Sequence, residues 1–285
     1  MILAFDIGGS RIKAARSHNG QLTPLGETAT PADDFAAFAA ALAGFHSTET
    51  AVAISITGVV DPTSGRIKVA NIPCLDTRNV SADLQAALGL PVLILNDADC
   101  FAMAEATSGA GRNRRNVFGV ILGTGVGGGL ILNGQIVTGP GGYAGEWGHG
   151  PVVENPALPC GCGQIGCLDT VGGARGIERL HLHFTGQTAS AQAIIAAWRA
   201  GDQSTMPRWL DLVSGQLAMV VNLIGAEIVP VGGGLANDTV LIACLDQAVR
   251  ARILRQTHAA LVVPATVSAD AGLAGAAAAG EARFG

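Results

Sequence analysis

The alternation of apolar and polar positions near the N-terminus predicts a run of short strands. Ile2 to Asp6 is predicted to form a buried strand, and Arg11 to Ala15 a second strand after a turn at Gly8-Gly9-Ser10. His18-Asn19-Gly20 then turns the chain into a third strand. The chain therefore opens with a meander and not with the strand, helix and strand of a dinucleotide-binding unit.

Further along the chain, helical and strand-like patterns alternate. Residues 33–45 carry apolar side chains at helical spacing, and a second helix has Ser81 as its expected N-cap and ends at Gly89 and Pro91. Strands are predicted at residues 51–56, 92–95, 117–122 and 227–231, and helices at residues 98–107, 175–183, 188–200, 207–225 and 270–277. Pro230 cannot donate a ladder hydrogen bond, which indicates a bulge or an edge position for its strand.

The second half of the chain repeats the opening pattern. The strand at 117–122 is followed by the glycine loop Gly123 to Gly129 and by a hairpin that turns at Asn133-Gly134. We therefore expect an internally duplicated α/β fold. A length of 285 residues suits two domains. We place a smaller N-terminal domain at 1–115 and a larger C-terminal domain at 116–269, with a cleft between them and a C-terminal helix at about 270–285 that packs back on the first domain.

The composition favours a small-molecule enzyme over a protein that binds nucleic acid or membranes. The net charge is -5 and the pI is about 5.6, and the one basic cluster, at Arg112, Arg114 and Arg115, suits a solvated loop. No apolar run reaches the ~18 residues of a membrane span. The first strand is predicted from residue 2, with no signal peptide before it, so we expect a cytoplasmic protein.

One imidazole and three thiols lie within nineteen residues, from His149 to Cys167. Cys160, Cys162 and Cys167 have a spacing that lets a glycine-rich knuckle gather three thiolates around one zinc ion, with His149 as the fourth ligand. Four protein ligands would make a closed, structural site in segment 149–167. The site would fix the loop that carries Glu146; the alternative is a group of buried cysteines without metal.

Three glycine-rich turns follow predicted strands, at Gly8-Gly9-Ser10, Gly123 to Gly129 and Gly232 to Gly234. Such turns let backbone N–H groups converge on a phosphate, although each alone could be an ordinary turn. Gly123, Gly125 and Gly128 satisfy a dinucleotide pattern, but a hairpin follows where a helix is required. A P-loop motif does not occur. We therefore expect one nucleotide held at several points.

Asn96-Asp97 lies where a predicted strand ends and a helix begins. A carboxylate at this place could be a general base for an incoming hydroxyl, with the neighbouring amide fixing that hydroxyl. It could equally be a cap for its helix. The residues alone do not separate these two roles for Asp97.

The zinc motif resembles that of the ROK family of bacterial sugar kinases and repressors, with all four ligands matched. The glycine turns resemble the ATP clamp of the actin, Hsp70 and hexokinase superfamily. The resemblance implies a duplicated two-domain actin-like (ribonuclease H-like) fold with nucleotide and sugar in the interdomain cleft. It also implies ATP, Mg²⁺ and structural Zn²⁺ as cofactors, and a homodimer. Four residues depart from the usual pattern: Ser10 and Arg11 replace Thr and Lys, Thr57 replaces Pro, and Asp169 replaces Glu.

The resemblance also implies roles for individual residues, with Asp97 as the catalytic base. The implied sugar-binding residues are Gly58, Asn71, Asn96, Asp97, Glu146, His149 and Asp169. The implied ATP-binding residues are Asp6, which would face the magnesium ion through water, and Gly8, Gly9, Ser10, Arg11, Gly123, Thr124, Gly125, Gly127, Gly233 and Gly234.

Within the family a kinase is favoured over a repressor, because repressors carry an added N-terminal helix-turn-helix domain and the net charge here opposes DNA binding. The expected reaction transfers the γ-phosphate of ATP to the 6-hydroxyl of a hexose. The segments 121–134 and 96–102 look most like N-acetylglucosamine kinases, and Glu146 argues against N-acetylmannosamine. The alternatives are a glucokinase or a fructokinase and, more remotely, a sugar sensor without catalysis.

Overall fold

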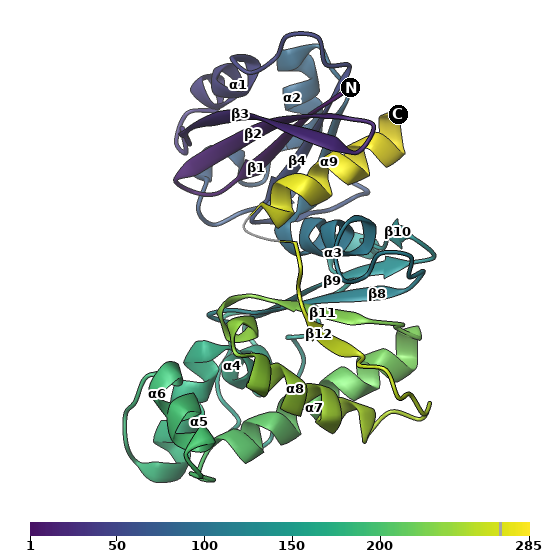
Figure 1. The fold of residues 1–285 in the computed structure, drawn as a ribbon. Coiled ribbons are helices and arrows are strands. Elements are labelled where there is room, and N and C mark those ends of the chain that lie inside the picture. The colour runs from purple at the N-terminus through teal and green to yellow at the C-terminus, as the bar shows by residue number, and fades with distance from the viewer. Residues whose placement is uncertain (268–269) are drawn as a thin grey trace. The chain divides into compact units, whose positions relative to one another are not determined.

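The computed structural model describes residues 1–267 and 270–285, and the chain forms two compact units. Unit 1 comprises Met1–Asn113, Ile136–Ala144 and Val267–Gly285, and unit 2 comprises Arg114–Gln135 and Gly145–Thr266. The predicted end of the second domain, residue 269, lies outside the described residues. Each unit is built around a five-stranded sheet (Figure 1).

The sheet of unit 1 has the strand order β3-β2-β1-β4-β7. Its strands are β1 (Ile2–Ile7), β2 (Arg11–His18), β3 (Gln21–Ala29), β4 (Ala51–Ile56) and β7 (Val92–Asn96). The first three strands form the predicted antiparallel meander, whereas β4 and β7 run parallel to β1. A short ribbon of β5 (Val59–Val60) and β6 (Ile67–Lys68) follows β4, and a 3₁₀ turn, η1, spans Pro73–Leu75.

Helices cover both faces of this sheet (Figure 1). The helices of unit 1 are α1 (Phe35–Ala43), α2 (Val80–Leu88), α3 (Asp97–Thr107) and α9 (Ala271–Phe284). Leu3 and Phe5 of β1 belong to the core that includes α1 and α2, whereas Ala4 packs with Leu273 of α9. Because side chains alternate along a strand, Asp6 points to the same face as Ala4, where α9 lies.

The C-terminal helix α9 packs closely against α3 and the sheet, as its small residues predict. A Cβ atom at Gly275 would lie 1.8 Å from the carbonyl oxygen of Cys100, and one at Gly280 would lie 2.8 Å from side chains of Ala53 and Ile2. Figure 1 shows this helix, in yellow, beside the purple N-terminal strands of the same unit. Glycine is therefore required where α9 meets α3.

Unit 2 repeats the topology of unit 1, which confirms the duplicated α/β fold. Its sheet has the order β10-β9-β8-β11-β12. The strands are β8 (Val117–Leu122), β9 (Val126–Leu132), β10 (Gln135–Ile136), β11 (Val229–Gly232) and β12 (Val262–Pro264). As in unit 1, the first two strands are antiparallel, and the last two run parallel to the first. The hairpin turns at Asn133-Gly134, as predicted, with φ positive at both residues.

The helices of unit 2 enclose its core. They are α4 (Asp169–Gly172), α5 (Ala174–Thr185), α6 (Ala191–Arg199), α7 (Met206–Ile224) and α8 (Thr239–Arg250), and the 3₁₀ turn η3 spans Gly234–Asn237. Another 3₁₀ turn, η2 (Pro140–Gly142), belongs to unit 1. Trp209 of α7 is fully buried, and its indole N–H donates to the carbonyl of Gly172 at 3.0 Å, which ties α7 to α4.

Three local predictions are wrong. Asn79, and not Ser81, caps α2: the Asn79 side chain accepts from the N–H of Ala82, while the Ser81 hydroxyl donates to the carbonyl of Val92. The glycine loop predicted at 123–129 ends at Gly125, because β9 begins at Val126 and pairs with β8.

The third wrong prediction concerns Pro230. Its strand, β11, lies inside the sheet between β8 and β12 and not at an edge. Ile228 pairs with Val117 of β8, and Val231 pairs with Val120, three residues further along both strands. The pairing is therefore interrupted at Pro230 without the extra residue that a bulge would insert. A ladder gap thus accommodates the missing N–H group.

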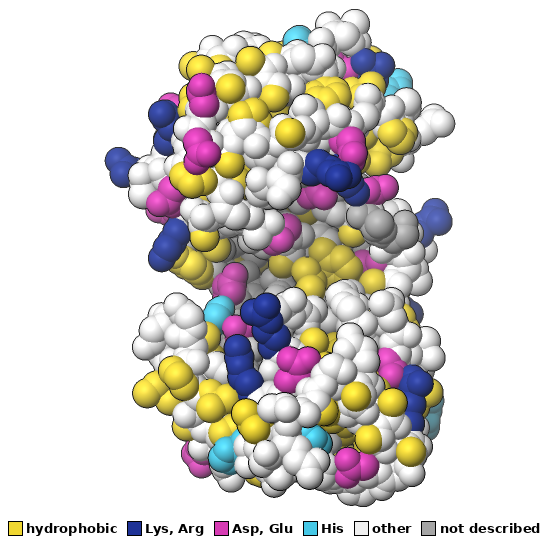
Figure 2. Space-filling view, turned by 90° about the vertical axis from the view of Figure 1, so that its left-hand side faces the viewer, with side chains coloured by type: hydrophobic (Ala, Val, Ile, Leu, Met, Phe, Trp, Pro, Cys, Tyr) yellow, Lys and Arg dark blue, Asp and Glu magenta, His cyan; other side chains and the backbone are white. Residues whose placement is uncertain are grey.

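Charged side chains of both signs are interspersed on the faces of the units seen in Figure 2, instead of gathering into one basic surface. Arg112, Arg114 and Arg115 are exposed, as expected of a solvated loop. Within residues 1–267 and 270–285, no helix combines the length and the apolar character that crossing a membrane would need.

Candidate active site

Asp97 lies at the junction of β7 and α3 in unit 1. Asn96 is the N-cap of α3, because its Oδ1 accepts the N–H of Ala98 at 2.8 Å, while its Nδ2 donates to the carbonyl of Gly58 at 3.0 Å. Asp97 Oδ1 shares the N–H of Ala98 at 2.9 Å, and Asp97 Oδ2 accepts from the hydroxyl of Thr57 at 3.3 Å. The capping position thus belongs to Asn96, and Asp97 is the first residue of the helix.

The surroundings of Asp97 favour a proton acceptor. Burial raises the pKa of Asp97 above its ordinary value, and the hydrogen bond from Thr57 offsets part of this rise. A carboxyl group whose pKa moves toward neutrality is a better general base than a fully solvated one.

A second half-buried carboxylate, Asp6, lies near the end of β1. The hydroxyl of Ser55, on the neighbouring strand β4, donates to Asp6 Oδ1 at 2.9 Å. Burial raises the pKa of Asp6, and the hydrogen bond from Ser55 and the charge of Lys13 oppose the rise. Lys13 is itself paired with Asp270 at 2.8 Å. Sequence reasoning identified Asp6 but missed Ser55 and Lys13, whose positions follow from strand register.

The first glycine turn connects β1 and β2. The N–H of Gly8 donates to the carbonyl of Arg11 at 2.9 Å, and a Cβ atom at Gly9 would lie 3.1 Å from Asn71. The turn therefore brings the predicted phosphate-side Gly9 against the predicted sugar-side Asn71. Ser10 is exposed, and the guanidinium of Arg11 pairs with Glu27 at 2.8 Å in solvent.

The second glycine turn, in unit 2, connects β8 and β9. The N–H of Ala174, at the start of α5, donates to the carbonyl of Gly123 at 2.8 Å. A Cβ atom at Gly125 would lie 2.4 Å from Asp169 Oδ1. The turn is therefore packed tightly between α4 and the start of α5. Gly127 lies outside it, in β9 opposite Ile121.

The second and third glycine turns line one pocket of unit 2. A Cβ atom at Gly233, whose φ is +85°, would lie 2.5 Å from the carbonyl group of Leu122, so the two turns are in contact. The pocket is lined by Gly123, Thr124, Ala174, Gln192, Ile195, Ala196, Arg199, Gly234, Leu235, Asn237 and Asp238. Arg199 forms an ion pair with Asp238 at its wall.

Sequence reasoning found the turns of this pocket but missed the contribution of α6. Gln192, Ile195, Ala196 and Arg199 follow the i, i+3, i+4, i+7 spacing of one helical face. That spacing was a signal from which one wall of the pocket could have been predicted.

The four predicted metal ligands gather in unit 2. The donor atoms of His149, Cys160, Cys162 and Cys167 all lie within 4.8 Å of one another. Cys160 Sγ is 3.6 Å from His149 Nδ1, and Cys162 Sγ is 3.6 Å from Cys167 Sγ. A tetrahedral zinc ion, with bonds of about 2.3 Å to sulfur and about 2.0 Å to nitrogen, sets its ligand atoms about 3.5–3.8 Å apart.

Local chemistry in the knuckle also suits zinc. The backbone N–H of Gln164 is the main cause that lowers the pKa of Cys162, to about 6, whereas burial raises the pKa of Cys160 to about 11. Binding at Cys160 must therefore displace a proton, as is usual for metal ligands. The N–H of Gly150 points to Cys167 Sγ at 3.4 Å. The residues fit a closed zinc site.

Two predicted sugar-side carboxylates flank this cluster. Glu146 Oε2 lies 3.6 Å from Nε2 of His149, on the side of the ring away from the cysteines. Asp169 Oδ1 accepts the N–H of Val126 at 2.8 Å, and the N–H of Asp169 donates to the carbonyl of Gly148. One carboxylate therefore contacts the cluster through His149, and the other is directed at the second glycine turn.

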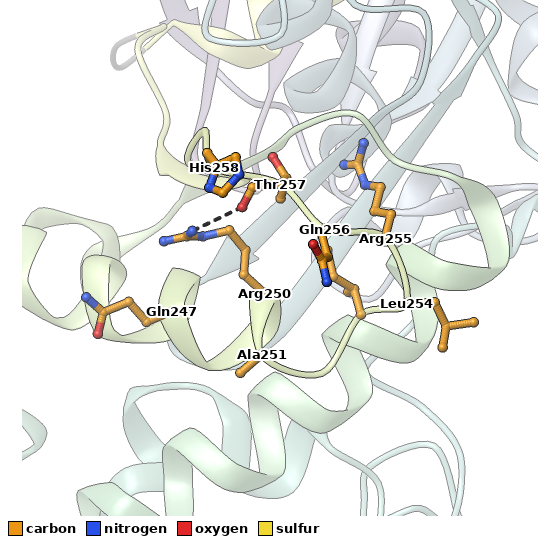
Figure 3. Close-up of a pocket in the computed structure, with 9 residues that line it drawn as sticks. Gln247, Arg250, Ala251, Leu254, Arg255, Gln256, Thr257 and His258 are labelled. Carbon is orange, nitrogen blue, oxygen red and sulfur yellow. Dashed lines mark hydrogen bonds between the residues drawn. The ribbon is translucent and has the colours of Figure 1, made fainter.

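Another pocket of unit 2, near the end of α8, contains none of the predicted site residues (Figure 3). Its guanidinium groups are occupied: Arg250 binds Asp246 at 2.8 Å and the carbonyl of Thr257 at 3.3 Å, and Arg255 binds the carbonyl of Ala226 at 2.7 Å. Leu254 points away from the other labelled side chains. We assign no function to this pocket.

Comparison with known proteins gives consistent matches along the chain. The profile of the ROK family matches residues 2–282. An N-acetyl-D-glucosamine kinase of Pasteurella multocida (strain Pm70) is 33% identical over 299 residues, covering 98% of each chain. The N-acetylgalactosamine kinase AgaK of Shewanella sp. (strain ANA-3) is 36% identical over 274 residues, covering 89% of this chain and 88% of the relative.

Solved structures with similar folds match over a comparable length. A ROK hexokinase from Thermus thermophilus has a TM-score of 0.85 and 27% identity, covering 100% of this chain and 99% of the other. A ROK family glucokinase from Streptomyces griseus, solved in complex with glucose and AMPPNP, has a TM-score of 0.72 and 27% identity, covering 97% of both chains.

Proposed function

Because the chain belongs to the ROK family, we propose that it is an ATP-dependent sugar kinase that phosphorylates the 6-hydroxyl of a hexose. The observation that carries this proposal is the Asp97 carboxylate. It lies at the start of α3, its pKa is raised by burial, and its two oxygens are held by Ala98 and Thr57. A base fixed in this way can accept the proton of an attacking hydroxyl group.

The other residues of unit 1 position the acceptor. Asn96 is held by Gly58 and by the helix start, so its amide has a fixed direction for binding a sugar hydroxyl. Asp97 takes the hydroxyl proton as the oxygen attacks, which contributes about 10²- to 10⁴-fold to the rate. ATP with Mg²⁺ supplies the phosphoryl group and neutralises its negative charge. The glycine turns offer backbone N–H groups to phosphate oxygens.

We propose N-acetyl-D-glucosamine as the preferred sugar. The support is the Pasteurella multocida relative, which is named for this activity and matches 98% of the chain. The Shewanella relative is named for N-acetylgalactosamine, which differs from N-acetylglucosamine only in its configuration at C4. N-acetylgalactosamine is thus a second candidate, and glucose and fructose remain the alternatives drawn from the sequence.

The remaining parts of the proposal concern the cofactor and the assembly. His149, Cys160, Cys162 and Cys167 hold a structural zinc ion, which fixes the loop bearing Glu146. We further propose a homodimer in the cytoplasm, on the strength of the family resemblance. Light scattering of the purified protein tests the dimer directly.

The proposal is tested by ATP-dependent ADP release from the purified, zinc-loaded protein. The panel is N-acetylglucosamine, N-acetylgalactosamine, glucose, fructose, N-acetylmannosamine and glucosamine, compared by kcat/KM. A clear preference for N-acetylglucosamine supports the full proposal. A preference for another sugar keeps the kinase and replaces the substrate. Turnover of none of them, with sugar binding retained in calorimetry, would instead support a sensor without catalysis.

A further inference from the structure

Thr57 stands where the resemblance leads one to expect proline, and its hydroxyl contacts the proposed base. Thr57 Oγ1 donates to Asp97 Oδ2 at 3.3 Å, while Asp97 Oδ1 accepts the backbone N–H of Ala98. Proline has no hydroxyl group, so this hydrogen bond depends on the residue that this chain carries at position 57.

The backbone around Thr57 is fixed on both sides. Strands β4 and β7 pair in parallel and both end at the pair Ile56 and Asn96. Thr57 and Asp97 directly follow these two residues, and the hydrogen bond between their side chains joins them. The carbonyl of Gly58 accepts from Asn96 Nδ2 at 3.0 Å. A Cβ atom at Gly58 would lie 3.0 Å from the carbonyl oxygen of Lys68, so Gly58 is packed against β6.

From these contacts we propose that Thr57 is a positioning residue for Asp97: its hydroxyl holds Oδ2 in one orientation, leaving the carboxylate ready for the acceptor hydroxyl. The inference rests on the proposed function, because it requires Asp97 to be the base. A hydrogen bond from a hydroxyl to a carboxylate is directional. Without it, the Asp97 carboxylate turns more freely about its χ2 angle.

The same hydrogen bond affects the ionisation of Asp97. It stabilises the charged form, and burial and the nearby charge of Asp6 on β1 destabilise that form. The charges of Asp97, Asp99 and Asp6 all act on the buried thiol of Cys100 on α3. Loss of the Thr57 hydroxyl therefore raises the pKa of Asp97. Because the base works as the carboxylate, the acidic limb of the pH profile moves to higher pH.

The test compares Thr57→Val, which removes the hydroxyl at nearly constant volume, with Thr57→Ser, which keeps it. We expect Thr57→Val to lower kcat about tenfold at neutral pH and to move the acidic limb of kcat/KM upward, with the KM for ATP unchanged. Thr57→Ser should retain the wild-type limb. Thr107→Val is the control, because that hydroxyl binds the carbonyl of Met103 at the far end of α3; it should leave the profile unchanged.

A second measurement separates this inference from the proposed function. Titration of the ¹³C-labelled Asp97 carboxyl by NMR reports its pKa whether or not the protein turns over a sugar. A higher pKa in Thr57→Val, restored in Thr57→Ser, supports the inference. An unchanged pKa together with an unchanged pH profile overturns it, even in an active kinase. Full activity of Asp97→Asn would overturn the proposed base and the role of Thr57 with it.

Discussion

Asp169 Oδ1 accepts a hydrogen bond from the backbone N–H of Val126 at 2.8 Å. Asp169 comes two residues after the proposed metal ligand Cys167, and Val126 comes directly after the second glycine turn. One carboxylate therefore links the end of the His/Cys segment to the predicted phosphate turn.

We expect Asp169→Ala to loosen the second glycine turn, because the N–H of Val126 loses its acceptor. The KM for ATP should rise roughly tenfold, which corresponds to the lower end of the about 1.5–3 kcal/mol that a hydrogen bond to a charged group contributes. Asp169→Asn keeps an acceptor oxygen and should show a smaller rise. Steady-state kinetics with varied ATP measures both, and an equal KM in all three proteins would contradict the link.

Replacing a metal ligand should release zinc and weaken sugar binding. Cys162→Ser removes one of four donor atoms, so zinc measured by atomic absorption should fall well below one per chain. Sugar affinity should fall as well, because His149 no longer fixes the position of Glu146. Cys244→Ser, in α8, is the matched control outside the cluster. If the zinc-depleted variant bound sugar with undiminished affinity, the metal site would not contribute to sugar binding.

Asp97→Asn should remove turnover and leave sugar binding measurable. The amide keeps the size and most hydrogen bonds of the carboxylate but cannot accept a proton, so kcat should fall by at least about 10²-fold. Calorimetry should give a sugar dissociation constant within a few-fold of the wild type. Near wild-type turnover would show that another group is the base.

Two glycine-to-alanine changes in helices should change the free energy of unfolding in opposite directions. Gly275→Ala places a methyl group 1.8 Å from the carbonyl oxygen of Cys100, so α9 must move away from α3 at a cost of about 1–3 kcal/mol. Gly215→Ala, inside α7, meets no atom within 4 Å and should raise stability by about 0.5–1 kcal/mol. Chemical denaturation of both variants measures the difference, and a tolerated Gly275→Ala would refute the close packing.

Glu49 should stabilise the folded protein at neutral pH and lose this contribution in acid. Its side chain is fully buried; burial raises its pKa, but hydrogen bonds from the N–H of Ser47 and from Arg16 outweigh this effect and lower the pKa to about 2. The stability is complete above the ordinary pKa of 4.5 and is lost as the pH falls from there toward 2.

We expect this contribution to be on the order of 3 kcal/mol. Glu49→Gln should therefore lower the free energy of unfolding at pH 7 and flatten its fall below pH 4.5. Asp83→Asn is the control, because Asp83 is more than one-third exposed in its pair with Arg78 and should contribute little. An equal pH dependence in Glu49→Gln and the wild type would refute the prediction.

Most of the fold follows from sequence patterns, and the failures have local causes. The strand at 51–56 and the helix after Asn96 were predicted to within a residue, because apolar runs and cap residues coincide there. Asn79 and Ser81 both suit an N-cap, and the choice between them depends on Val92, whose carbonyl accepts from the Ser81 hydroxyl eleven residues away. Local sequence does not contain that information.

The start of β9 was predicted too late along the chain, again because a contact with a distant segment decides it. Glycine disfavours strands, yet a Cβ atom at Gly128 would lie 2.8 Å from the Trp147 ring. The close approach of another segment requires glycine there, and this approach exists only in the folded unit. The gathering of His149, Cys160, Cys162 and Cys167, by contrast, was predictable, because one short segment carries all four residues. The contact between Thr57 and Asp97 was not, because it joins residues forty positions apart.

The repeated topology also reveals an asymmetry between the two copies. Strands β1 and β8 occupy the same place in their sheets, and each leads directly into a glycine turn, at Gly8 and Gly123. Asp6 is the next-to-last residue of β1, whereas the aliphatic residue Ile121 holds the same position in β8. The two turns therefore begin beside different side chains: a carboxylate that can attract a cation precedes the turn of unit 1, and a hydrocarbon side chain that cannot do so precedes the turn of unit 2.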